Sequence, residues 1–261
     1  MEFFLNEILD DGSVKEAVKN STELYPEAKR TAEQFISSGI APKLAHGIFP
    51  VIVLGCLADY ALKKNSSRGI SREVTAETLK DINIWIKNYK LISGKDGLAE
   101  FHWLKYHYTG DLFRLGRLQF RINRSLDGVP SGEYSIETHI PQGEPLTESA
   151  ALDSFSQAKE FFKNHFPEYS PEYFMCDSWL LNPNLALVLD GNSNIVKFMR
   201  LWTPFPFKND NSAQAMERVF GFGTTLASLP SAPENTSLQR RLKAYLLSGG
   251  TLDITGGYRI I

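Results

Sequence analysis

EYSIETHI, at residues 133–140, alternates between two kinds of side chain. In a strand, its more apolar face would carry Tyr134, Ile136, Thr138 and Ile140, and its polar face Glu133, Ser135, Glu137 and His139. A period of two residues predicts a β-strand with one face against a core and one polar face.

The preceding segment, residues 112–123, repeats this pattern. It predicts a strand on which Arg117, Gln119 and Arg121 share one face, opposite Leu118, Phe120 and Ile122. The turn-forming residues 127–132, DGVPSG, lie between the two segments and favour an antiparallel hairpin. If the polar faces coincide, Arg117, Gln119, Arg121, Glu137 and His139 would form one polar cleft.

Helices and strands alternate in the rest of the chain. The pattern predicts helices at 149–165, 183–189, 212–220 and 237–247, and strands at 173–181, 195–202 and 252–254. Alternating elements after an antiparallel start favour a mixed, mainly antiparallel sheet flanked by helices.

The N-terminal part follows the helical period instead. Amphipathic or apolar stretches predict helices at 22–36 and 42–62 and a further one over residues 79–89. The turn cluster Gly94-Lys95-Asp96-Gly97 then marks a boundary between a helical domain, 1–96, and a second domain, 97–261. The predicted fold class is therefore α/β (α+β), with the helical domain first.

Composition excludes several classes of protein. The 28 Lys and Arg residues are balanced by 30 Asp and Glu residues without a long basic block, so no nucleic-acid partner is expected. The apolar run 48–57 is about half a membrane span, and the N-terminus lacks a signal-peptide pattern. Two cysteines, Cys56 and Cys176, in apolar surroundings indicate reduced thiols and a cytoplasmic location. His102 and His107 lack further ligands, so no metal is expected. Oligomeric state stays open.

Five motifs carry a resemblance to a known family. They are LGRLQF at 115–120, HIPQGEPL at 139–146, FF and HFP at 161–162 and 165–167, CDSWLL at 176–181, and SN at 193–194. With these motifs the chain resembles bacterial two-domain acyltransferase-domain proteins. The resemblance implies an N-acyltransferase-type N-terminal domain, a GNAT-like C-terminal domain, and acyl-CoA or acetyl-CoA as the co-substrate of a small-molecule reaction.

The resemblance also implies where CoA would bind. In the wider superfamily, backbone N–H groups between a strand and the next helix hold the pyrophosphate, because loop amides and helix N-termini attract anions. Residues 142–147, QGEPLT, occupy that place, and the implied contacts are Ile140, Gln142, Gly143 and Thr147. The stretch has one glycine where the superfamily usually has a pair, with Glu144 and Pro145 beside it.

Acyl transfer to an amine needs a general base, and Glu137 or His139 is the candidate. Arg117, Gln119 and Arg121, with Asp177 and Trp179 at the border, would contact the substrate. The family's thioester would enter through an opening between the strands at 135–140 and 173–181.

Three other interpretations remain. The polar residues line a solvated sheet face; or the protein is a non-catalytic module that binds a small anion or a protein partner, as the atypical loop suggests; or Cys176 with His139 forms a thiol nucleophile for hydrolysis.

Overall fold

The computed structural model describes residues 1–261, which divide into two compact units. The first consists of Met1–Leu115 with Gln119–Arg121, and the second of Gly116–Leu118 with Ile122–Ile261. The division into domains 1–96 and 97–261 stays a prediction.

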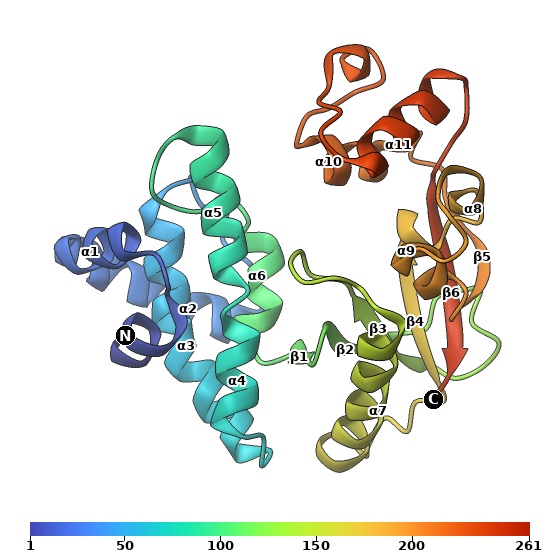
Figure 1. Ribbon diagram of the computed structural model, residues 1–261. Coiled ribbons are helices and arrows are strands. Elements are labelled where there is room, and N and C mark those ends of the chain that lie inside the picture. Colours follow the sequence, from blue (N-terminus) through green and yellow to red (C-terminus); the bar gives the residue numbers. More distant parts are fainter. The chain divides into compact units, whose positions relative to one another are not determined.

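The first unit is helical and is organised around α3 (Ile48–Ser67) (Figure 1). Because α3 is buried on most of its circumference from Pro50 to Ala58, other helices must surround it. One continuous apolar cluster joins them. The unit also contains a π-helix at Phe4–Ile8, α1 (Gly12–Asn20), a 3-10 turn at Thr22–Leu24, α2 (Tyr25–Ser38), α4 (Arg72–Leu79), α5 (Ile82–Ser93), α6 (Phe101–Tyr108) and β1 (Phe113–Leu115).

The helix predicted at 42–62 begins later, at Ile48, because the residue before it has another role. Gly47 exchanges two backbone hydrogen bonds with Leu98, at 3.0 and 2.9 Å, and its φ of 132° is not helical. This bridge fastens the start of α3 to the segment before α6. No helix of the chain combines enough length with enough hydropathy to cross a lipid bilayer.

A buried carboxylate, Asp81, forms a second organising point of the first unit. Its Oδ2 accepts hydrogen bonds from the indole nitrogens of Trp85 (3.0 Å) and Trp103 (3.3 Å), and its Oδ1 accepts one from the Gln119 amide (2.7 Å). His107 Nε2 lies 3.5 Å from Oδ2. The Asp81 side chain is only 2% exposed, so these donors replace the water that a carboxylate otherwise needs.

The second unit contains most of a six-stranded sheet of order β1-β2-β3-β4-β6-β5. β3 pairs with β4 in parallel, whereas β6 pairs antiparallel with both β4 and β5. The predicted mixed sheet with flanking helices is thus confirmed. Its strands after β1 are β2 (Leu118–Arg124), β3 (Tyr134–His139), β4 (Tyr173–Ser178), β5 (Thr203–Lys208) and β6 (Ile254–Ile260).

Helix α7 (Glu148–His165) packs on this sheet (Figure 1). The ring centroid of Phe155 on α7 lies 4.9 Å from that of Phe174 on β4. Trp179 belongs to a separate apolar cluster of the second unit. That cluster is built largely from α8 (Leu185–Val188), α10 (Ala213–Phe220) and α11 (Ser237–Leu247).

Four predicted strands were wrong in part. The strand at 173–181 ends at Ser178, whose hydroxyl caps a 3-10 turn at Trp179–Leu181. The strand at 112–123 breaks into β1 and β2, because Gly116 has a φ of 66° and turns the chain. Residues 195–202 contain helix α9 (Asn194–Met199), capped by the Ser193 hydroxyl, which accepts a hydrogen bond from Val196 N at 3.3 Å. The strand predicted at 252–254 extends instead from Ile254 to Ile260.

The Gly47–Leu98 bridge makes a prediction for Gly97. Its φ is 143°, and an added Cβ would meet the backbone of Gly47, which cannot rotate away. Gly97→Ala should lower the free energy of unfolding by about 2 kcal/mol or more. Gly94→Ala is the matched control, since its φ is also positive but nothing lies within 4 Å, and about 1 kcal/mol is expected. Urea unfolding followed by circular dichroism measures both; equal losses would contradict the role of the bridge.

Asp81→Asn should destabilise the protein although it preserves shape. The new amide would place its N–H groups against the N–H groups that now donate to Asp81. It would also remove the negative charge that strengthens those hydrogen bonds, so the free energy of unfolding should fall by about 2–4 kcal/mol. Asp127→Asn changes the same group at an exposed position without a hydrogen bond and should stay within about 0.5 kcal/mol of the parent. Equal urea midpoints for the two variants would show that the Asp81 contacts contribute little.

Candidate functional site

The parallel ladder between β3 and β4 is short. It contains only the pairs Ile136–Phe174 and Glu137–Met175. β4 nevertheless continues to Ser178 and pairs with β6 along its whole length. Since a ladder holds strands about 4.8 Å apart, the strands are free to diverge where it ends. The short ladder thus lies between the same two strands where the resemblance predicts an opening for the thioester.

Glu137 and His139, the predicted catalytic residues, come together beside this point. They lie on the same face of β3, and His139 Nε2 is 3.4 Å from Glu137 Oε1. Asn123 on β2 donates a 2.8 Å hydrogen bond to the other oxygen, Oε2. The Glu137 side chain is 10% exposed and that of His139 is 21% exposed. A carboxylate that accepts a hydrogen bond at Oε2 therefore lies next to a more accessible imidazole.

The loop after β3 presents backbone donors. The N–H groups of Gly143, Glu144 and Leu146 form no hydrogen bond within the protein. Gly143 has a φ of 139° with nothing within 4 Å of its missing Cβ, so a ligand has room to approach its backbone. The loop ends at Thr147, whose hydroxyl accepts a hydrogen bond from Ala150 N (3.2 Å) and caps α7. These features are those that favour an anion at a helix N-terminus.

Arg117 holds this loop in place. It lies in the turn between β1 and β2 and is 8% exposed. Its guanidinium donates to the carbonyl oxygens of Pro141 (2.9 Å) and Glu144 (2.8 Å). Its backbone N–H donates to the Ser154 hydroxyl on α7 (2.8 Å), which in turn donates to Ala150 O (2.8 Å). One residue therefore connects the turn, the loop and the first turns of α7.

The other predicted contacts are dispersed. Gln119 and Arg121 belong to the first unit, where Gln119 binds Asp81 and the Arg121 guanidinium lies 4.3 Å from the centre of the Tyr106 ring. Ile140 follows β3 directly, and Asp177 lies opposite Gly256 in the sheet. Trp179 is 5% exposed in an apolar cluster. Substrate contacts by these residues, by Arg117 and by Gln142 stay predictions.

Sequence reasoning missed Asn123 and Ser154. Asn123 has the same parity as Gln119 and Arg121 on the predicted strand, so the alternation already placed it on the polar face. Ser154 is a small polar residue next to Phe155 on the inward stripe of the predicted helix, and such a residue usually needs a buried partner. Asp81 has a comparable signal, because apolar Leu79 lies two residues before it and apolar Ile82 follows it directly.

The chain is similar to acyltransferases of known structure. One, an acyltransferase in complex with decanoyl-CoA and teicoplanin, is 26% identical, with a TM-score of 0.76 over 99% of this chain and 82% of that one. Another, an acyltransferase mutant in complex with octanoyl-CoA, is 24% identical with a TM-score of 0.82 over 100% and 86% of the respective chains, and shows the fold alone. No curated protein sequence matches the chain.

Two family models cover almost the whole chain. The N-acyltransferase N-terminal domain matches residues 4–110, and the GNAT-like C-terminal domain matches residues 112–259. The resemblance seen in the five motifs is thereby confirmed, and the chain belongs to the family with a GNAT-like C-terminal domain, preceded here by an N-acyltransferase N-terminal domain.

Proposed function

We propose that the protein is an N-acyltransferase that moves an acyl group from acyl-CoA to a small-molecule amine. The observation that carries this proposal is the early end of the β3–β4 ladder, with Glu137 and His139 beside it. The likeness to an acyltransferase that binds decanoyl-CoA supports it.

The reaction needs one proton acceptor. The amine nitrogen attacks the thioester carbonyl carbon, and the new C–N bond replaces the C–S bond as the CoA thiolate leaves. The nitrogen must lose a proton to a base, and the thiolate takes one up to become CoA thiol. A base within hydrogen-bond reach of the nitrogen accelerates this step by about 10²–10⁴.

His139 is the better placed of the two candidates. Its side chain is more exposed than that of Glu137, and Glu137 Oε2 already accepts a hydrogen bond from Asn123. Its Nε2 faces Glu137 Oε1 at a distance of 3.4 Å. Glu137 then orients the imidazole and stabilises its charged form, as carboxylates do beside catalytic histidines. In this proposal His139 is the base and Glu137 the positioning residue.

The loop after β3 fits the pyrophosphate of CoA. Gly143, Glu144 and Leu146 supply unengaged N–H groups, and the N-terminus of α7 adds a favourable dipole. Arg117 binds carbonyl oxygens of the same loop, which fixes its conformation before a ligand arrives. Ile140, Gln142 and Thr147 are the neighbouring positions that we expect to contact the cofactor.

The cellular setting belongs to the same proposal. Both cysteines are free, which supports a reducing compartment, and we infer a bacterial cytoplasmic enzyme. A module that binds but does not transfer is the alternative outcome of the first experiment below.

Thermal unfolding with decanoyl-CoA tests the proposal first. A ligand present at 100 times its Kd adds about 2.7 kcal/mol of stability, and for a chain of this size the Tm should rise by about 5 °C or more. Free decanoate is the control for the acyl chain alone. A concentration-dependent shift followed by release of CoA thiol with an amine panel supports the enzyme. A shift without thiol release indicates a binding module, and no shift at all refutes the proposal.

Variants of the pair separate binding from chemistry. His139→Gln should lower the rate of acyl transfer by about 100-fold and leave the decanoyl-CoA shift in Tm unchanged, because the base acts only on the amine. Glu137→Gln should lower the rate less and change its pH profile. His102→Gln, at an exposed position on α6, is the control and should keep the parent rate. Parent-like transfer by His139→Gln would remove the assignment of the base.

The alternative mechanism, with a thiol nucleophile, requires a reactive Cys176, whereas the structure predicts an unreactive one. Burial, with a smaller contribution from Asp177 and Glu137, raises the pKa of the Cys176 thiol well above its usual value. Cys176 therefore stays protonated near neutral pH and should not react. In a Cys56→Ser background, iodoacetamide at pH 8 should leave native protein unmodified in mass spectra for as long as free cysteine needs for complete reaction. Urea-unfolded protein is the control. Rapid labelling of the native protein would revive the thiol nucleophile.

A further inference from the structure

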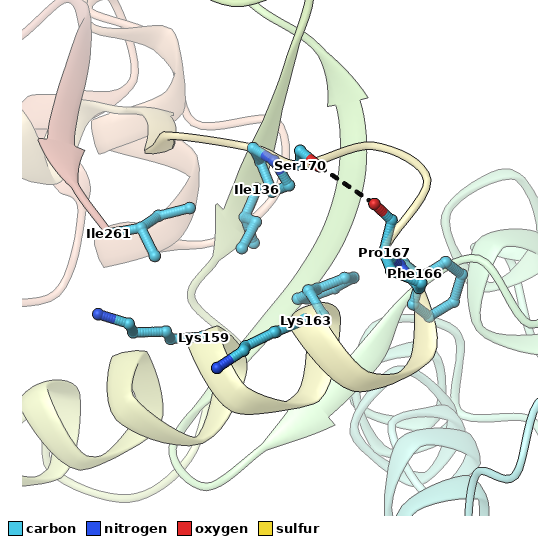
Figure 2. A pocket seen from close by; sticks show the side chains of 9 residues that line it. Ile136, Lys159, Lys163, Phe166, Pro167, Ser170 and Ile261 are labelled. Carbon is cyan, nitrogen blue, oxygen red and sulfur yellow. Dashed lines mark hydrogen bonds between the residues drawn. The ribbon is translucent and has the colours of Figure 1, made fainter.

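A second site is present at the C-terminal end of α7. A cavity of about 260 Å³ opens there within the second unit (Figure 2). Its walls are mainly apolar, with Ile136 from β3, Phe162 from α7, Phe166 after the helix and Ile261 after β6. A dry cavity of about 150 Å³ already accepts benzene, so this one has room for a longer apolar group.

Two cations stand at its edge. Lys159 and Lys163 are one helical turn apart, and Figure 2 shows both side chains extending from the same face of α7. A third cation, Arg259, lies 4.4 Å from the centre of the Phe155 ring, one turn before Lys159. Its Nε has no hydrogen-bond partner. None of the three forms an ion pair with a carboxylate, and the two lysines, which line the cavity, place a positive charge beside its apolar walls.

This cavity is separate from the catalytic pair. Ile136 and Glu137 are adjacent in β3, and adjacent residues of a strand point to opposite faces. Ile136 lines the cavity with residues of α7, so Glu137 and His139 project from the other face of the strand. The cavity also adjoins the last turns of α7, whereas the loop proposed for CoA precedes its first turn.

We propose that the cavity binds a free medium-chain fatty acid. The alkyl chain lies among Ile136, Phe162 and Phe166, and the carboxylate lies against Lys159 and Lys163. Apolar walls reward each buried methylene by about fourfold in affinity, and the unpaired lysines select an anionic head over a cationic one. The site does not depend on acyl transfer by the protein.

Isothermal titration calorimetry with octanoate, hexanoate and octylamine tests the chemistry of the site. Octanoate should bind about 15-fold more tightly than hexanoate, because hexanoate lacks two methylenes, and octylamine should bind more weakly than octanoate because the lysines repel it. Equal affinity for octanoate and octylamine would overturn the proposal. So would the absence of octanoate binding at concentrations up to about 10 mM, since a Kd above that value corresponds to very weak binding.

Variants then locate the site. Lys159→Gln with Lys163→Gln should weaken octanoate binding by about tenfold, while Lys208→Gln, at an exposed position without a partner, should not change it. Ile261→Trp places a larger side chain in the cavity and should abolish binding. Its effect on Tm should be small, because residue 261 follows the last strand. Parent-like affinity in either test variant contradicts the assigned location.

Competition distinguishes this site from the proposed acyl-CoA site. Octanoate should bind with the same affinity when decanoyl-CoA is present in excess, and loss of binding would mean that the two ligands share one site. If decanoyl-CoA does not bind at all, the proposed acyltransferase fails, yet the octanoate titrations still decide the fatty-acid site.

Discussion

Strand β4 depends on a constraint that applies to every strand inside a sheet: its backbone groups need partners on both sides. β6 supplies one side over the whole of Tyr173–Ser178, but β3 supplies the other side only as far as Met175. Beyond that residue the unmatched side of β4 must be satisfied by water, by side chains or by a ligand. The early end of the ladder thus leaves this side of β4 without a strand partner, and Glu137 and His139 lie on β3, where the ladder ends.

The surroundings of this place are held by side chains rather than by more sheet. Arg117 binds the loop after β3 through two carbonyl oxygens, and its own N–H binds Ser154 on α7. Because Arg117 is buried, each of these bonds is shielded from competing water. A loop that is already ordered loses less conformational entropy when it binds an anion. The same residue therefore contributes to stability and, in the proposed function, to the binding of an anion.

Strong local sequence patterns were sufficient to predict much of the fold. The alternation at 133–140 predicted β3, and the apolar stripe at 149–165 predicted α7 almost to the residue. The pairing of Glu137 with His139 also followed from parity alone. Arg117 illustrates what parity cannot provide: Gly116 turns the chain just before it, so the residue leaves the strand and binds a loop that is 24 and 27 residues away in sequence. The helix at Asn194–Met199 was missed because a serine cap outweighed a weak strand pattern.

The position of β6 has a consequence for the order of events during synthesis. β5 reaches the sheet only through β6, which lies between it and β4. The helical cluster of the first unit is complete once Tyr108 has emerged, whereas β5 has no pairing partner until the chain has been made as far as Ile254–Ile260. At about 5–20 residues per second this leaves β5 without a partner for roughly 3–10 s. A nascent chain must therefore keep that segment soluble, and Lys208 and the prolines Pro204 and Pro206 suit it to that interval, since charge and proline discourage pairing with other chains.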